Sequence, residues 1–162
     1  MEDGQQCWRS PSRGCLDDAG VIREIARFIE ENGPGNYRVM IGTDSSATRG
    51  AAVPLVTAVT VWRVGNGGIF FIWRSRPRRY TNLGQRMHAE AAQSIGIAAW
   101  LRGELRSTGL GLDVDEIHLD VGINGPTREF VRILVDQVNG HGYCARCKPH
   151  AVVASRVAHQ FA

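Results

Sequence analysis

The spacing of hydrophobic residues divides the chain into segments with two different periods. Residues 17–32 carry apolar side chains at spacings of three and four, between an aspartate and a Gly-Pro-Gly sequence, which predicts an amphipathic helix. Three segments rich in apolar and β-branched residues follow at 37–44, 53–63 and 69–73. Because short turns join these segments, the pattern predicts three antiparallel strands.

The second half of the chain alternates helical patterns with short apolar segments. Helices are predicted over 83–106, from Pro126 to about 138, and over 151–160, with strands over 116–122 and 143–147. This alternation implies parallel strands joined by right-handed crossovers. The two halves together predict an α/β fold: a five-stranded mixed sheet flanked by helices, with its first three strands antiparallel and its last two parallel to the first.

The N-terminal segment and the composition set the domain organisation. Residues 1–16 are polar and lack periodicity, which predicts a loose leader before a single domain over residues 17–162. Hydrophobic residues make up 43% of the chain and charged residues 22%, which is typical of a globular domain and excludes a disordered or collagen-like chain. We recognise neither an apolar run of the ~18 residues that a membrane span needs nor a secretory signal, so we expect no membrane contact and a cytoplasmic location.

Four cysteines leave a minor alternative open. Cys7, Cys15, Cys144 and Cys147 are expected to be reduced in a cytoplasmic chain. Cys144 and Cys147 form a CxxC pair, a spacing shared by zinc sites and redox centres, although a lone pair is most often structural. A zinc site that joins both ends of the chain, or a redox module, is therefore the weakest of the interpretations.

Two aspartates lie where predicted strands end. Asp44 follows the apolar residues of segment 37–44, and Asp120 follows Ile117 and Leu119. If these strands are adjacent and parallel, their carboxyl ends coincide and the two like charges lie close together. A divalent cation with oxygen ligands would offset their repulsion.

Two further residues extend this acidic group. Glu90 lies in the first turns of the long predicted helix, on a face that becomes apolar further along, so we expect it to point toward the sheet. His159 lies on the last predicted helix and could reach the same sheet edge from the other side, where a histidine can bind a metal or move a proton.

Motifs in this order resemble the ribonuclease H-like superfamily and, within it, the YkuK-like family of bacterial proteins. The resemblance covers roughly residues 20–162. It is carried by Ile41-Gly42-Thr43-Asp44-Ser45, the helix of Glu90, His118-Leu119-Asp120-Val121-Gly122, and Lys148-Pro149 followed by Ala154-Ser155-Arg156-Val157-Ala158-His159.

The resemblance implies a metal-dependent nuclease that hydrolyses phosphodiesters in RNA, DNA or a hybrid. Asp44 would bridge two Mg²⁺ or Mn²⁺ ions, Glu90 and Asp120 would complete the site of one ion, and His159 would lie near the other. The fourth position is usually acidic in the YkuK-like pattern, so a histidine there raises proton transfer as an alternative role.

A basic segment offers a place for nucleic acid. Arg74, Arg76, Arg78 and Arg79 lie between Trp73 and Tyr80, just before the helix of Glu90. Arginines neutralise phosphates and aromatic rings stack on bases, although a solvated loop has the same composition. Lys148 is a further candidate phosphate contact.

The main alternative is a non-catalytic nucleic-acid or protein-binding module that keeps the fold with a degraded site. We do not expect His88, His118 or His150 to bind a metal, and His118 could support Asp120 from behind.

Overall fold

A computed structural model describes residues 7–46 and 50–162. Within this part of the chain, seven strands form one mixed sheet in the order β2-β1-β5-β4-β3-β6-β7. The strands are β1 (Trp8–Ser10), β2 (Gly14–Leu16), β3 (Tyr37–Asp44), β4 (Val56–Arg63), β5 (Gly68–Arg74), β6 (Glu116–Leu119) and β7 (Cys144–Arg146). The helices are α1 (Asp18–Asn32), α2 (Leu83–Thr108), η1 (Arg128–Phe130), α3 (Val131–Gly140), the π-helix η2 (Val153–Ala158) and the 3₁₀ helix η3 (His159–Phe161).

The predicted strand directions are confirmed. β4 pairs antiparallel with both β3 and β5, whereas β6 runs parallel to β3 and β7 parallel to β6. The helix boundaries also follow the sequence signals: the Asp17 side chain accepts a hydrogen bond from the Gly20 amide and so caps α1, and Gly33 ends it with a positive φ of 68°.

The prediction of five strands and a loose leader is wrong for residues 8–16. These residues form the hairpin β1–β2, and β1 pairs antiparallel with β5. Trp8 is buried between Trp73 and Trp100, with ring centroids 5.3 and 5.4 Å away. Strands of three residues are too short to show alternation, so the hairpin depends on contacts that periodicity does not reveal.

The expectation of four reduced cysteines is also wrong, because Cys7 and Cys15 form a disulfide that closes the hairpin. A four-cysteine zinc site is therefore excluded while this bond is intact. Cys144 and Cys147 are free thiols, and burial raises the pKa of Cys147.

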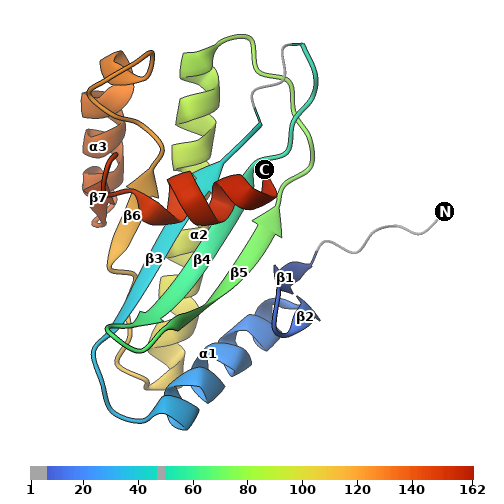
Figure 1. The fold of residues 1–162 in the computed structure, drawn as a ribbon, viewed down its shortest axis with the longest axis vertical. Coiled ribbons are helices and arrows are strands. Elements are labelled where there is room, and N and C mark those ends of the chain that lie inside the picture. The colour runs from blue at the N-terminus through green and yellow to red at the C-terminus, as the bar shows by residue number, and fades with distance from the viewer. Residues whose placement is uncertain (1–6, 47–49) are drawn as a thin grey trace, which may run out of the picture.

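Helical segments cover both faces of the sheet. α1, α2 and α3 bury one face against a core that includes Ile25, Leu101 and Leu134. η2 and η3, which together we call the C-terminal helical segment, cross the opposite face over β3 and β4 (Figure 1). Val153 and Ala158 there pack on Val56, Ala58 and Ile72.

Candidate functional site

Asp44 and Asp120 lie at the carboxyl ends of two adjacent parallel strands. The β3–β6 ladder pairs Gly42 with His118 and Thr43 with Leu119, and Asp44 and Asp120 are the next residues along each chain, at the same edge of the sheet. Adjacent strands lie ~4.8 Å apart. Asp44 is buried although it is charged, and Asp120 lies just beyond the end of β6, which is shorter than the predicted strand.

Glu90 enters from α2 on one face of the sheet. Its carboxylate is buried and accepts a hydrogen bond of 2.6 Å from the Ser45 hydroxyl. Glu90 and Asp120 line the same small cavity of ≈ 10 Å³, at the lower limit for one water molecule. The inward orientation predicted for Glu90 is therefore observed.

The pKa of Glu90 is raised from 4.5 to about 8. Burial is the largest cause, and the charges of Asp44 and Asp120 add to it, whereas the Ser45 hydrogen bond and the charge of Arg86 act in the opposite direction. The charges of both aspartates therefore act on the Glu90 carboxyl group, which lies on a different element from either of them.

A chain of buried hydroxyl groups fixes α2 on the sheet next to Glu90. The Thr43 hydroxyl lies 2.7 Å from that of Ser94 on α2 and 2.8 Å from that of Thr57 on β4. Gln93 donates from its side-chain amide to Thr57 over 2.8 Å. Because these contacts tie the helical turn after Glu90 to two strands, they restrict where the Glu90 carboxylate can lie.

His159 reaches Asp44 from the opposite face. Its Nδ1 lies 2.6 Å from Asp44 Oδ2, and the histidine side chain is 72% exposed whereas that of Asp44 is 8% exposed. Side chains alternate along a strand, so Asp44 faces the C-terminal helical segment while the next residue, Ser45, reaches Glu90 on α2.

Lys148 is the cation beside Asp120. Its Nζ lies 3.1 Å from Asp120 Oδ1, and its backbone amide donates to the carbonyl of Val121 over 2.9 Å. The ion pair lacks hydrogen-bond geometry: Oδ1 is buried and has no hydrogen-bond partner among the described residues. A buried carboxylate oxygen with unused lone pairs is a suitable ligand for a hard cation.

The side chains near Asp44 have the ligand types that bind Mg²⁺ or Mn²⁺, but they are not arranged around one position. Three carboxylates and a histidine supply the oxygen and nitrogen ligands that these ions accept. Over the described ranges 7–46 and 50–162, however, no group of three or more His, Cys, Asp or Glu side chains is positioned to hold a metal. Asp44 is paired with His159, Glu90 with Ser45 and Asp120 with Lys148, so these contacts must rearrange for a shared ion.

Two residues act electrostatically on or with Glu90: Arg86, which was missed in the sequence, and Tyr80, which was considered only as a stacking ring. Arg86 lies one helical turn before Glu90, and Tyr80 is half-buried in the preceding segment. Burial raises the pKa of Tyr80, the charge of Arg78 lowers it, and that of Glu90 raises it. The i, i+4 spacing of Arg86 and Glu90 could have indicated the first of these.

The basic segment has a defined backbone. Arg78 forms an isolated antiparallel bridge with Val53, and Arg79 donates from Nη1 to the Gly50 carbonyl over 2.7 Å. Arg74 donates to the carbonyl of Phe161. Arg76, Arg78 and Arg79 are exposed.

Trp73, by contrast, packs on Trp8, so its ring belongs to the core around the hairpin rather than to a base-stacking surface.

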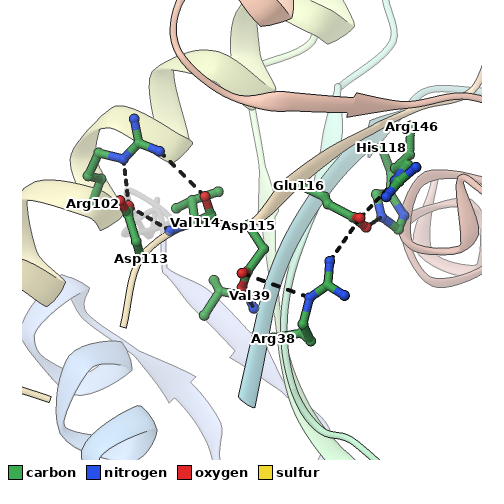
Figure 2. Close-up of polar contacts among 9 residues, drawn as sticks. All are labelled: Arg38, Val39, Arg102, Asp113, Val114, Asp115, Glu116, His118 and Arg146. Carbon is green, nitrogen blue, oxygen red and sulfur yellow. Dashed lines mark hydrogen bonds and ion pairs between the residues drawn. The ribbon is translucent and has the colours of Figure 1, made fainter. Parts of the chain in front are cut away.

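His118 belongs to a separate polar cluster, which Figure 2 shows around Glu116. The His118 ring accepts from the Val153 amide at Nδ1 over 3.1 Å, and its Nε2 lies 3.1 Å from Glu116 Oε2. Burial lowers the pKa of His118, and the contact with Glu116 only partly offsets this decrease. Its hydrogen bonds therefore hold the start of η2 rather than Asp120.

The described part of the chain has no helix long and apolar enough to cross a membrane.

Comparison with known proteins agrees with this architecture. A family model described as "Ribonuclease H-like" matches residues 20–162. The chain is 28% identical over 156 residues to "Uncharacterized protein YkuK" of Bacillus subtilis (strain 168), and the matched region covers 87% of this chain and 88% of that protein. No solved structure is significantly similar. Since the family model covers nearly the whole chain, the protein belongs to the ribonuclease H-like family.

Proposed function

We propose that this protein is a metal-dependent nuclease whose acidic core is Asp44, Glu90 and Asp120. The observation that carries the proposal is at the ends of β3 and β6, where Asp44 and Asp120 each follow a paired residue and both of their charges act on the buried Glu90 of α2. Soluble proteins rarely bury several carboxylates together without a compensating cation. Family membership raises the expectation of phosphodiester chemistry, but the proposal depends on the side chains.

Each residue has a role that follows from its position. Asp44 is buried and would be the central ligand. Glu90 is oriented by Ser45, and Asp120 offers an oxygen without a hydrogen bond. These residues and His159 would hold two Mg²⁺ or Mn²⁺ ions, which would supply a polarised water and stabilise the charge on the leaving oxygen. No covalent intermediate with the protein is required.

His159 departs from the acidic residue usual at its position, and its geometry suits proton transfer. A carboxylate accepts hydrogen bonds, so the ring donates from Nδ1 to Asp44. The largely exposed ring then offers Nε2 to a proton from water or from the substrate. In this role His159 helps orient Asp44 and exchanges protons near it.

The substrate is nucleic acid in this proposal. Arg76, Arg78 and Arg79 project from the segment that leads into α2, close to Glu90 in the chain. They form an exposed cationic surface for phosphates, to which Lys148 adds a charge beside Asp120.

The direct test is Asp44→Asn. Purified protein is incubated with labelled single-stranded RNA, single-stranded DNA, a hybrid and a branched junction, in Mg²⁺, Mn²⁺ or EDTA. We expect cleavage of at least one substrate with metal, none in EDTA, and loss of activity in Asp44→Asn with an unchanged circular dichroism spectrum. Asp136→Asn, an exposed site on α3, is the matched control. Cleavage that survives in Asp44→Asn would contradict the proposal.

A non-catalytic nucleic-acid-binding module is the second candidate. The observation that favours it is the pairing of Asp44 with His159 and of Asp120 with Lys148, which gives each aspartate a partner without a metal. Such a protein would bind the same oligonucleotides with equal affinity in Mg²⁺ and EDTA, and would cleave none of them.

A further inference from the structure

The C-terminal helical segment covers only part of its face of the sheet. In Figure 1 it crosses the upper part of β3 and β4 and leaves the lower part of these strands and of β5 bare. A cavity of ≈ 490 Å³ lies on this face, within the range of small-ligand sites. We call it the sheet-face groove; its apolar lining includes Met40, Trp62, Phe70, Val152 and Val157.

Two rows of the sheet form the floor of the groove. In one row Met40 lies between Glu116 and Thr60, and Thr60 lies opposite Phe70. The Thr60 hydroxyl is buried and has no hydrogen-bond partner among the described residues. Because Thr60 lines the groove, a ligand that displaces the side chains covering this hydroxyl would satisfy it.

The neighbouring row presents an open aromatic ring. Trp62 is 39% exposed and lies opposite Gly68 on β5. A Cβ at Gly68 would lie 2.6 Å from the Val61 carbonyl oxygen, so only glycine fits there without a shift. The indole consequently has no cross-strand side chain on that side, and a flat ring can lie against it.

The lining of the groove also includes a guanidinium group, that of Arg38. Arg38 donates from Nη2 to Glu116 Oε1 over 2.8 Å, and Arg146 donates to the same oxygen over 2.7 Å, so two guanidinium groups share one carboxylate. Arg38 Nε lies 3.8 Å from Asp115. Figure 2 shows the third guanidinium nitrogen of Arg38 pointing away from both carboxylates. This nitrogen can donate to an anionic ligand.

We propose that the sheet-face groove binds an unpaired nucleotide, with the base against Trp62 and the phosphate on Arg38. An exposed aromatic ring, a guanidinium group with a free donor and a buried hydroxyl match the base, the phosphate and the polar base edge respectively. The inference rests on the proposed function only in naming nucleic acid as the source of the nucleotide.

The groove is distinct from the acidic core. Arg38 lies six residues before Asp44 on β3, a separation of ~20 Å along an extended strand. The two residues share a face, since side chains alternate, but the C-terminal helical segment packs on β3 and its His159 contacts Asp44. The groove would thus hold an unpaired end of a substrate away from the bond that is cleaved.

The test measures binding of adenosine 5′-monophosphate by isothermal titration calorimetry in EDTA, with Asp44→Asn as the protein so that neither metal nor cleavage contributes. We expect saturable binding with one nucleotide per chain, weakened about tenfold in Trp62→Ala and much less in Trp62→Phe. Ile133→Ala, which removes an exposed apolar side chain on α3, is the matched control and should leave binding unchanged. Adenosine, which lacks the phosphate, should bind about tenfold more weakly than the monophosphate.

Several results would overturn the inference. These are the absence of saturable binding, unchanged affinity in Trp62→Ala, and binding of indole-3-acetate at least as tight as that of the nucleotide, which would indicate a site for aromatic carboxylates. A dimer in sedimentation that dissociates in Trp62→Ala would show that a second copy of the chain covers the groove. Arg38→Lys keeps the ion pair with Glu116 and tests the phosphate contact without removing the charge. Because metal is absent, nucleotide binding can succeed even if the protein proves not to be a nuclease.

Discussion

Replacing Glu90 by glutamine should stabilise the metal-free protein, increasingly so as the pH rises. The folded-state pKa of Glu90 is raised from 4.5 to about 8, so between these values the folded state binds a proton that the unfolded state releases. The stability of the wild-type protein therefore falls as pH increases through this window, and the contribution of the protonated acid is fully present only below pH 4.5. Glutamine keeps the shape and the acceptor for Ser45 but does not ionise.

The magnitude follows from the pKa. A pKa shift of one unit corresponds to about 1.4 kcal/mol. A pKa raised from 4.5 to about 8 therefore lowers the unfolding free energy of the wild-type protein by about 3 kcal/mol at pH 7 and about 5 kcal/mol above pH 8. These figures are upper limits, because rearrangement of the neighbouring aspartates lowers the free-energy cost of ionising Glu90.

The assay is urea unfolding in EDTA at pH 5, 7 and 8.5, followed by far-UV circular dichroism. The difference in unfolding free energy between Glu90→Gln and wild type should grow by several kcal/mol from pH 5 to pH 8.5. Glu104→Gln, an exposed site on the same helix, should show no such growth. If the difference for Glu90→Gln stays constant within about 0.5 kcal/mol, the carboxyl group titrates normally and the burial argument fails.

Two further predictions concern the cations around the site. Lys148→Met should raise the affinity for Mn²⁺ by about two- to fivefold, because the ammonium group 3.1 Å from Asp120 no longer competes with the metal. Calorimetry with Arg132→Met as the control measures this affinity, and an unchanged value would show that the Lys148–Asp120 pair does not oppose metal binding. Replacing Arg76, Arg78 and Arg79 together with alanine should weaken oligonucleotide binding. The slope of log K against log salt should become shallower by an amount that corresponds to up to about three phosphate contacts. If the slope measured by fluorescence anisotropy is unchanged, this segment is not part of the binding surface.

Most of the fold between residues 17 and 150 could be predicted because local patterns and tertiary structure agree there. The apolar spacing of α1 matches its buried face, and the apolar segment 37–44 coincides with β3. Alternation of strands and helices correctly implied that β6 lies parallel to β3. That single relation is what brings Asp44 beside Asp120.

The hairpin β1–β2 could not be predicted in the same way. Each strand has three residues, which is less than two full periods of alternation. Its stability comes from Trp8 in a cluster of three tryptophans, with a 2.8 Å hydrogen bond from its indole to Asp18, and from the Cys7–Cys15 disulfide. Trp73 and Trp100 are distant in sequence, so no local signal announces the contact.

The sequence predicted which residues belong to the candidate site, but not which side chains they contact. Strand ends identified Asp44 and Asp120, and the helical face identified Glu90. Lys148 was considered only as a phosphate contact, because its pairing with Asp120 depends on the loop that follows β7. The partners of Asp44 and Glu90 on opposite faces follow from strand alternation, which explains why no preformed metal cluster is present among the described residues.

Anomalous scattering from crystals soaked in Mn²⁺ tests the shared metal site most directly. We expect a Mn²⁺ peak within bonding distance of carboxylate oxygens from both Asp44 and Asp120, with the Lys148 ammonium displaced from its position 3.1 Å from Asp120. A crystal that shows no peak at the ends of β3 and β6, with Lys148 still paired to Asp120 at saturating Mn²⁺, would contradict the proposed metal-dependent chemistry.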